Sequence, residues 1–294
     1  MEQCIQDLGK AVAYLRSEGF ERIVLVGHSG GGSLVCYYQA GAEVPSSLTT
    51  PTGIPLLFHA EQLPQVDAIA LLAPHPSRAS VLADWLDPSV IDEEDMLACD
   101  PLLDMFNPNN GPPYDADWLE RYRRAQVARN NRISDRALAL LRMMEAGASP
   151  ETLPSDRLLT VYRTGADPRF TDVGIDPNGR QAQPIMIARK SNYSHLSMAR
   201  ISTLRSWLSQ WSLGLSRADG PSCLARTTVP VLVVSYGADQ IVYPSQTGQY
   251  VEAAGGRGRH VVVERANHFL RNQEGHQETV ADLLAQWAEE VLGL

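Results

Sequence analysis

A five-residue stretch at 27–31, Gly-His-Ser-Gly-Gly, constrains the fold of this chain more than any other part of it. It matches the pattern G-x-S-x-G, in which a serine occupies a sharp turn between a strand and a helix. Residues 23–26, Ile-Val-Leu-Val, form an apolar run typical of a strand buried on both faces, and residues 33–40 carry a helical pattern. Glycines at such a turn leave room for a strained backbone. The stretch therefore predicts a nucleophile elbow at Ser29.

Helical and strand patterns alternate on both sides of this turn. Apolar residues recur at helical spacing between positions 5 and 15, whereas residues 41–64 hold four prolines and are expected to form a loop. Further buried strands are expected at residues 68–73, 230–234 and 260–263, and further helices at 245–254 and 280–291. This alternation predicts an α/β fold with a mostly parallel sheet.

The alternation stops between residues 77 and 226, where helical patterns and aromatic side chains predominate. This segment is expected to form an inserted, mainly helical lid. The chain then divides into a first part of the core at 1–76, the lid at 77–226, and a second part of the core at 227–294.

Within the expected lid, residues 115–147 carry a long helical pattern that is interrupted near Asn130. Residues 158–162 and 184–188 are expected to pair as a small hairpin. Trp207 and Trp211 lie four apart on one helical face, and we expect them to pack the lid onto the core rather than line a substrate pocket.

Composition and charge exclude several classes of function. The chain has 294 residues, of which 44% are hydrophobic, and this suits a large globular domain with an insertion. Its formal net charge of -9 argues against a nucleic-acid partner, which requires a basic patch. Four scattered cysteines without a C-x-x-C pair indicate neither a zinc site nor a disulfide framework. The sequence shows no signal peptide and no apolar run long enough to cross a bilayer, so we expect a cytoplasmic protein.

A serine nucleophile needs an imidazole to accept its proton and a carboxylate to orient that imidazole. Asp239 follows the expected strand at 230–234, and His268 follows the expected strand at 260–263. One loop, one helix and one strand fit between them, which brings both loops to the same edge of a parallel sheet. Asp239 and His268 are therefore the expected partners of Ser29.

Through the elbow, the turn Gly237-Ala238-Asp239 and the loop Asn267-His268, the chain resembles the α/β-hydrolase family. The resemblance covers residues 1–75 and 227–294. It implies that Ser29, Asp239 and His268 form a catalytic triad. It also implies that the backbone N–H of Gly30 is one oxyanion donor.

Asp167 and His276 compete for two of these roles. Asp167 also follows an apolar run, but it lies in the expected lid with no helix and strand leading directly to a histidine, so Asp239 is favoured. His276 lies in a polar run before the last helix and is expected to be solvated.

The remaining histidines are expected to be structural or are unassigned. His260 begins a strand and is expected to be structural, and His28 is expected to pack or donate a hydrogen bond. His75 ends the strand next to the elbow strand; we expect a loop histidine, with a side chain facing the site as the alternative. His195 in the lid is not assigned.

These residues favour hydrolysis of an ester or related carbonyl substrate, through an acyl-enzyme and without a metal or organic cofactor. A serine in place of aspartate argues against the family's epoxide hydrolases and haloalkane dehalogenases. A thioesterase, a lactonase, a carbon–carbon bond hydrolase or an acyltransferase can use the same triad. A noncatalytic relative that binds a ligand or a protein is the alternative from another class. The aromatic lid favours an apolar small-molecule substrate, and the sequence does not predict the oligomeric state.

Only residues 1–22 precede the elbow strand, and they account for one helix. In the family several strands come before that helix, and a loop among them supplies the second oxyanion N–H. The sequence therefore predicts an N-terminally incomplete fold with residues 23–26 at the edge of a four-stranded sheet, and poor solubility or activity for the isolated chain. A start site upstream, or a separate chain that supplies those strands, would complete it.

Overall fold

The computed structural model describes residues 1–52, 56, 58–59, 62–147 and 156–294. These residues form two compact units. The first comprises Met1–Arg78, Asp176–Gln181 and Arg217–Leu294, and the second comprises Ala79–Ile175 and Ala182–Ser216. Part of the loop expected at 41–64, namely residues 53–55, 57 and 60–61, lies outside the described residues. The assignment of residues 77–226 as a lid remains a prediction.

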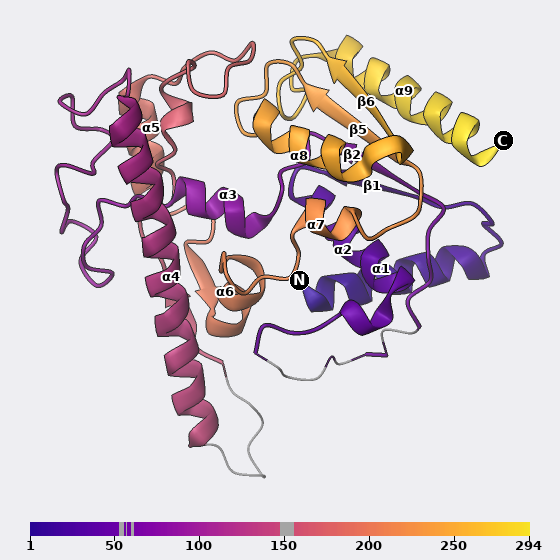
Figure 1. Ribbon diagram of the computed structural model, residues 1–294, viewed down its shortest axis with the longest axis horizontal. Helices are drawn as coiled ribbons and strands as arrows, with labels where there is room; N and C mark the ends of the chain where they lie inside the picture. The colour runs from indigo at the N-terminus through magenta and orange to yellow at the C-terminus, as the bar shows by residue number, and fades with distance from the viewer. Residues whose placement is uncertain (53–55, 57, 60–61, 148–155) are drawn as a thin grey trace. The chain divides into compact units, whose positions relative to one another are not determined.

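The first unit contains a parallel sheet of four strands in the order β1-β2-β5-β6 (Figure 1). The strands are β1 (Val24–His28), β2 (Ala68–Leu72), β5 (Val231–Tyr236) and β6 (Gly258–Val263). In their register, His28 lies beside Leu72, and Leu72 lies beside Val234. Among the described strands β1 pairs with β2 alone, and at this edge the Val26 side chain is 50% exposed. The mostly parallel sheet expected from the sequence is confirmed, whereas the burial of residues 23–26 on both faces is not.

Helices cover both faces of this sheet (Figure 1). They are α1 (Glu2–Ser17), α2 (Gly30–Glu43), α7 (Gly220–Leu224), α8 (Pro244–Ala254) and α9 (Glu274–Leu292). Because side chains alternate along a strand, Val231 and Val233 join the apolar core on the side of α1, α2, α7 and α8. Leu232 and Val234 face the other way and pack with α9. Because the four strands are parallel, the loops at their carboxyl ends all lie at one end of the sheet.

The second unit is mainly helical. Its helices are α3 (Arg78–Trp85), which begins at the last residue of the first unit, α4 (Ala116–Ala146), α5 (Ile185–Tyr193) and α6 (Leu204–Gln210). The expected interruption near Asn130 is wrong, because α4 is continuous. Asn130 is fully buried; its Nδ2 donates to the Trp211 carbonyl at 2.8 Å and its Oδ1 accepts from the Leu213 N–H at 2.9 Å. A polar residue thus continues the buried face of the helix.

The hairpin expected between residues 158–162 and 184–188 is also wrong. Strand β3 (Leu158–Thr160) pairs antiparallel with β4 (Ile201–Thr203). Residues 185–188 instead begin α5, in which Ala188 and Asn192 are buried while Met186 is 70% exposed. The two buried residues are four apart, which is the spacing of one face of a helix. The apolar residues at 185–187 therefore do not form a buried strand.

Three short 3-10 helices complete the described elements, namely η1 (Pro45–Ser47), η3 (Pro168–Phe170) and η4 (Gly255–Arg257). Across the described residues, no helix combines the length and the apolar character that crossing a bilayer requires.

Candidate active site

Ser29 occupies the turn between β1 and α2, with backbone angles φ 55° and ψ -121°. Such a conformation costs a residue other than glycine about 1–3 kcal/mol and persists only where the surrounding structure enforces it. The Ser29 N–H donates to the Leu72 carbonyl at 2.9 Å, which ties the turn to β2. A Cβ atom on Gly27 would lie 2.6 Å from the backbone oxygen of Gly31. The tight path of the chain therefore requires glycine at position 27, two residues before the serine.

The side chains of Ser29, His268 and Asp239 are joined by two hydrogen bonds. His268 Nε2 lies 3.0 Å from Ser29 Oγ, and His268 Nδ1 lies 2.7 Å from Asp239 Oδ2. Asp239 Oδ1 accepts the backbone N–H groups of Ile241 at 2.7 Å and Val242 at 2.9 Å. His268 and Asp239 are each 1% exposed. The imidazole is thus held between the hydroxyl and a carboxylate that is itself fixed by its own loop.

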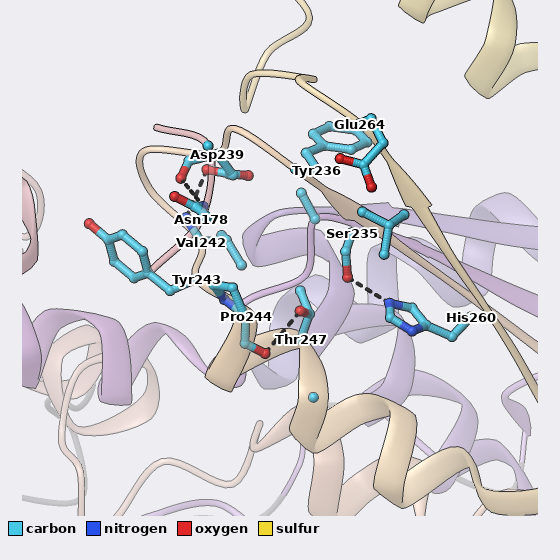
Figure 2. Close-up of a pocket in the computed structure, with 15 residues that line it drawn as sticks. Asn178, Ser235, Tyr236, Asp239, Val242, Tyr243, Pro244, Thr247, His260 and Glu264 are labelled. Atoms are coloured by element: carbon cyan, nitrogen blue, oxygen red, sulfur yellow. Dashed lines mark hydrogen bonds between the residues drawn. The ribbon is translucent and has the colours of Figure 1, made fainter. Parts of the chain in front are cut away.

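A separate segment of the chain supports the loop that carries Asp239. Asn178 Nδ2 donates to the Asp239 backbone carbonyl at 2.7 Å, as Figure 2 shows, and the Gly179 N–H donates to the Gly237 carbonyl at 2.8 Å. Residues 176–181 belong to the first unit, although the sequence placed them within the expected lid. Their turn-forming sequence, Asp-Pro-Asn-Gly-Arg-Gln, marks a turn but does not identify its partner.

A family model described as the alpha/beta hydrolase family matches residues 3–283 of the chain. The chain belongs to the alpha/beta hydrolase family. Membership supports hydrolytic activity on a small-molecule substrate in general. A search of curated proteins found none that matches this hydrolase.

Three solved structures illustrate its similarity to other proteins. A complex of DcsB with its substrate analogue is 13% identical, with a TM-score of 0.49 over 98% of this chain and 72% of that chain. The esterase domain of a Rhodothermus marinus protein is 15% identical, with a TM-score of 0.45 over 97% of this chain and 68% of that chain. A monoacylglycerol lipase of Paleococcus ferrophilus is 12% identical, with a TM-score of 0.43 over 98% of this chain and 76% of that chain. Similarity at this level does not identify a substrate.

His28 contacts the loop that carries His268. Its Nε2 donates to the His268 backbone carbonyl at 2.9 Å, and the centroids of the two rings are 4.8 Å apart. Burial lowers the pKa of His28. In this hydrolase His28 therefore positions the backbone of His268.

His75 packs directly against the elbow. A Cβ atom on Gly30 would lie 3.0 Å from His75 Nε2 and 3.3 Å from its Cε1. His75 is 6% exposed, and its buried Nδ1 has no hydrogen-bond partner among the described residues. Burial, with smaller effects from Arg78 and His268, lowers the pKa of His75 to about 3. An imidazole that is neutral at pH 7 thus lies beside the residue after Ser29. His75 lies in the loop after β2, as expected, and that its side chain faces the site remains a prediction.

Asp167 has other partners, in the second unit. It is fully buried, and its carboxylate pairs with Arg123 at 2.7 Å and Arg169 at 2.6 Å. Burial alone would raise its pKa, but the two guanidinium groups outweigh burial and lower the pKa to about 2. Asp167 therefore makes structural ion pairs, whereas Asp239 contacts His268.

The other residues considered from the sequence lie elsewhere. His276 Nε2 donates to the Glu264 carbonyl at 2.9 Å, His260 Nε2 lies 2.8 Å from Ser235 Oγ, and His195 is exposed in the second unit. Trp207 and Trp211 belong to an apolar core of the second unit. The four cysteines are free thiols. The described residues contain no group of three or more His, Cys, Asp or Glu side chains placed to hold a metal ion.

Proposed function

We propose that this chain is a serine hydrolase that cleaves an ester or related carbonyl substrate through an acyl-enzyme. The observation that carries the proposal is the pair of hydrogen bonds at 3.0 Å and 2.7 Å that joins Ser29, His268 and Asp239. A histidine held in this way can take the serine proton at one nitrogen while the carboxylate stabilises the charge at the other. Ser29 is the nucleophile, His268 is the general base, and Asp239 orients the imidazole.

In the first step, His268 Nε2 accepts the proton of Ser29 Oγ as the oxygen attacks the carbonyl carbon. The carbonyl oxygen becomes an oxyanion, to which the Gly30 N–H donates. Gly30 is the first residue of α2, where backbone N–H groups have no partner inside the helix. His268 then gives the proton to the leaving oxygen, and the alcohol departs. Water then attacks the acyl-enzyme in the same way, with His268 as the base, and the acid is released.

We propose an apolar acyl substrate, because residues 77–226 are rich in aromatic side chains and are the proposed lid. A panel of 4-nitrophenyl esters of increasing acyl length tests this substrate class. Turnover should rise from acetate to longer acyl groups. A preference for acetate would contradict it.

Labelling with a fluorophosphonate probe tests the proposed reaction. Such a probe bonds covalently to an activated serine oxygen, so the wild type should be labelled and Ser29→Ala should not. Ser46→Ala is the matched control, because Ser46 is exposed and remote in sequence from the triad. An unlabelled wild type that folds normally would instead favour the noncatalytic binding protein.

A further inference from the structure

We propose that a cavity in the first unit binds a small organic amine. The cavity has a volume of about 330 Å³ and lies beside helix α8 and the carboxyl ends of β5 and β6 (Figure 2). Ser29 and His268 are not among the residues that line it, whereas Asp239 is. The proposed binding does not rest on the proposed hydrolysis.

Helix α8 leaves space on the side that faces this cavity. Gly248 lies inside the helix and lines the cavity, and a Cβ atom built on it would meet nothing within 4 Å. Glycine inside a helix costs about 1 kcal/mol relative to alanine. No close packing contact requires glycine at this exposed position, so a larger side chain here would extend into the space beside α8.

The walls combine apolar surface with a hydrogen-bonded polar pair. Val242, Pro244 and Val262 supply apolar surface. Ser235 Oγ lies 2.8 Å from His260 Nε2, and Figure 2 shows this pair at one side of the cavity. His260 is exposed, and the burial of part of its ring lowers its pKa. The pair can exchange hydrogen bonds with a ligand.

Two carboxylates line the cavity, and one of them is available to a ligand. Asp239 already accepts from His268 Nδ1 and from the backbone N–H groups of Ile241 and Val242. The Glu264 carboxylate has no hydrogen-bond donor among the described residues, and its Oε2 would lie 3.3 Å from a Cβ built on Gly237. The lining residues include neither lysine nor arginine, although the Arg180 guanidinium stacks over the ring of Tyr243, 4.7 Å from its centroid. The charged groups of the lining itself are carboxylates, which favours a cation over an anion beside Glu264.

These features together specify the chemical class of the ligand. A primary ammonium group would pair with Glu264 and donate to Ser235 Oγ, and an apolar body would pack against Val242, Pro244 and Val262. The volume is at the lower end of the range for small-molecule sites, about 300–1,000 Å³. A monoamine with a small apolar body therefore fits better than a peptide or a lipid.

Calorimetry at pH 7 with three probes of similar shape tests the charge preference. The probes are 2-phenylethylamine, 2-phenylethanol and 3-phenylpropanoate, which are cationic, neutral and anionic. We expect the amine to bind most tightly and the carboxylate most weakly. Glu264→Gln should weaken binding of the amine about 3-fold, as expected when an ion pair with an exposed carboxylate is removed, and should change the alcohol little.

Filling the cavity tests its location. Gly248→Leu should abolish binding of the amine. Because leucine forms helices better than glycine, the thermal unfolding temperature of this variant should be at or above that of the wild type. Gln249→Leu adds the same side chain at the next, exposed position of α8, which does not line the cavity, and should leave binding unchanged. Unchanged amine affinity in Gly248→Leu would place the site elsewhere. Equal or tighter binding of the carboxylate, or no binding of any probe to the folded wild type, would also overturn the proposal.

Discussion

Asn178 holds the backbone of Asp239 from a segment 61 residues away, through a 2.7 Å hydrogen bond to the Asp239 carbonyl. Asn178 Oδ1 in turn accepts the Arg180 N–H at 3.1 Å. The amide therefore links the 176–181 segment to the loop that presents the carboxylate to His268. This link makes Asn178 a positioning residue for the proposed triad.

Asn178→Asp keeps the acceptor oxygen but removes the N–H donor, so the Asp239 carbonyl loses its partner. We expect kcat to fall about 3-fold to 10-fold, equivalent to roughly 1 kcal/mol, with little change in KM. Ester hydrolysis by purified protein measures this effect. Asn109→Asp, at an exposed position, is the control. Wild-type kcat in Asn178→Asp would show that the Asp239 loop does not need this contact.

The acid of the triad can be distinguished from its rival by two matched substitutions. Asp239→Asn should lower kcat by a factor of ~10³–10⁴, because the amide no longer stabilises the correct His268 tautomer. Asp167→Asn breaks a buried ion pair with Arg123 and Arg169, and should lower the free energy of unfolding by about 3 kcal/mol while the folded fraction keeps its kcat. Ester turnover and denaturant unfolding measure the two effects. The opposite pattern would make Asp167 the catalytic acid.

Gly30→Ala should disturb the elbow, because the new Cβ would lie 3.0 Å from His75 Nε2. Forcing a contact of this kind costs about 1–3 kcal/mol, and the displaced elbow should also react more slowly with a fluorophosphonate. The double variant Gly30→Ala/His75→Ala should recover much of both losses, because the collision is removed. Gly31→Ala is the matched control, since a Cβ there meets nothing within 4 Å. Failure of the double variant to recover would show that His75 is not the obstacle.

His75 should make the stability of the fold depend on pH. Its folded pKa of about 3 is below the ordinary histidine value of 6.5, so the unfolded chain binds more protons between these limits. His75 therefore lowers the free energy of unfolding as the pH falls below 6.5, by up to about 1.4 kcal/mol per pH unit. His75→Leu should remove this part of the dependence. Urea unfolding of both proteins at pH 7, 5.5 and 4.5 measures the difference, and identical slopes would contradict the assignment.

Local sequence patterns determined the elbow, because it rests on contacts between residues that are close in the chain. They also predicted the parallel sheet, because the alternation of apolar strands and helices along the chain implies it, although its strands pair residues as far apart as Ile69 and Val231. Gly27 must be glycine because the next turn of backbone passes 2.6 Å from where its Cβ would be. Asp239 and His268 follow neighbouring apolar strands, and parallel strands β5 and β6 carry both loops to one end of the sheet. The candidate triad could therefore be predicted without any knowledge of distant contacts.

Only the tertiary structure decided the features that depend on contacts between distant residues. Asn178 reaches Asp239 from a segment that the sequence assigned to the lid. His75, which follows β2, packs against Gly30, which follows the neighbouring strand β1. Asn130 continues a helix because residues 211 and 213 satisfy its amide, and residues 185–188 are helical because their neighbours bury one side only. Propensity and periodicity describe one segment at a time, whereas burial and hydrogen bonding depend on the partner that folding brings to it.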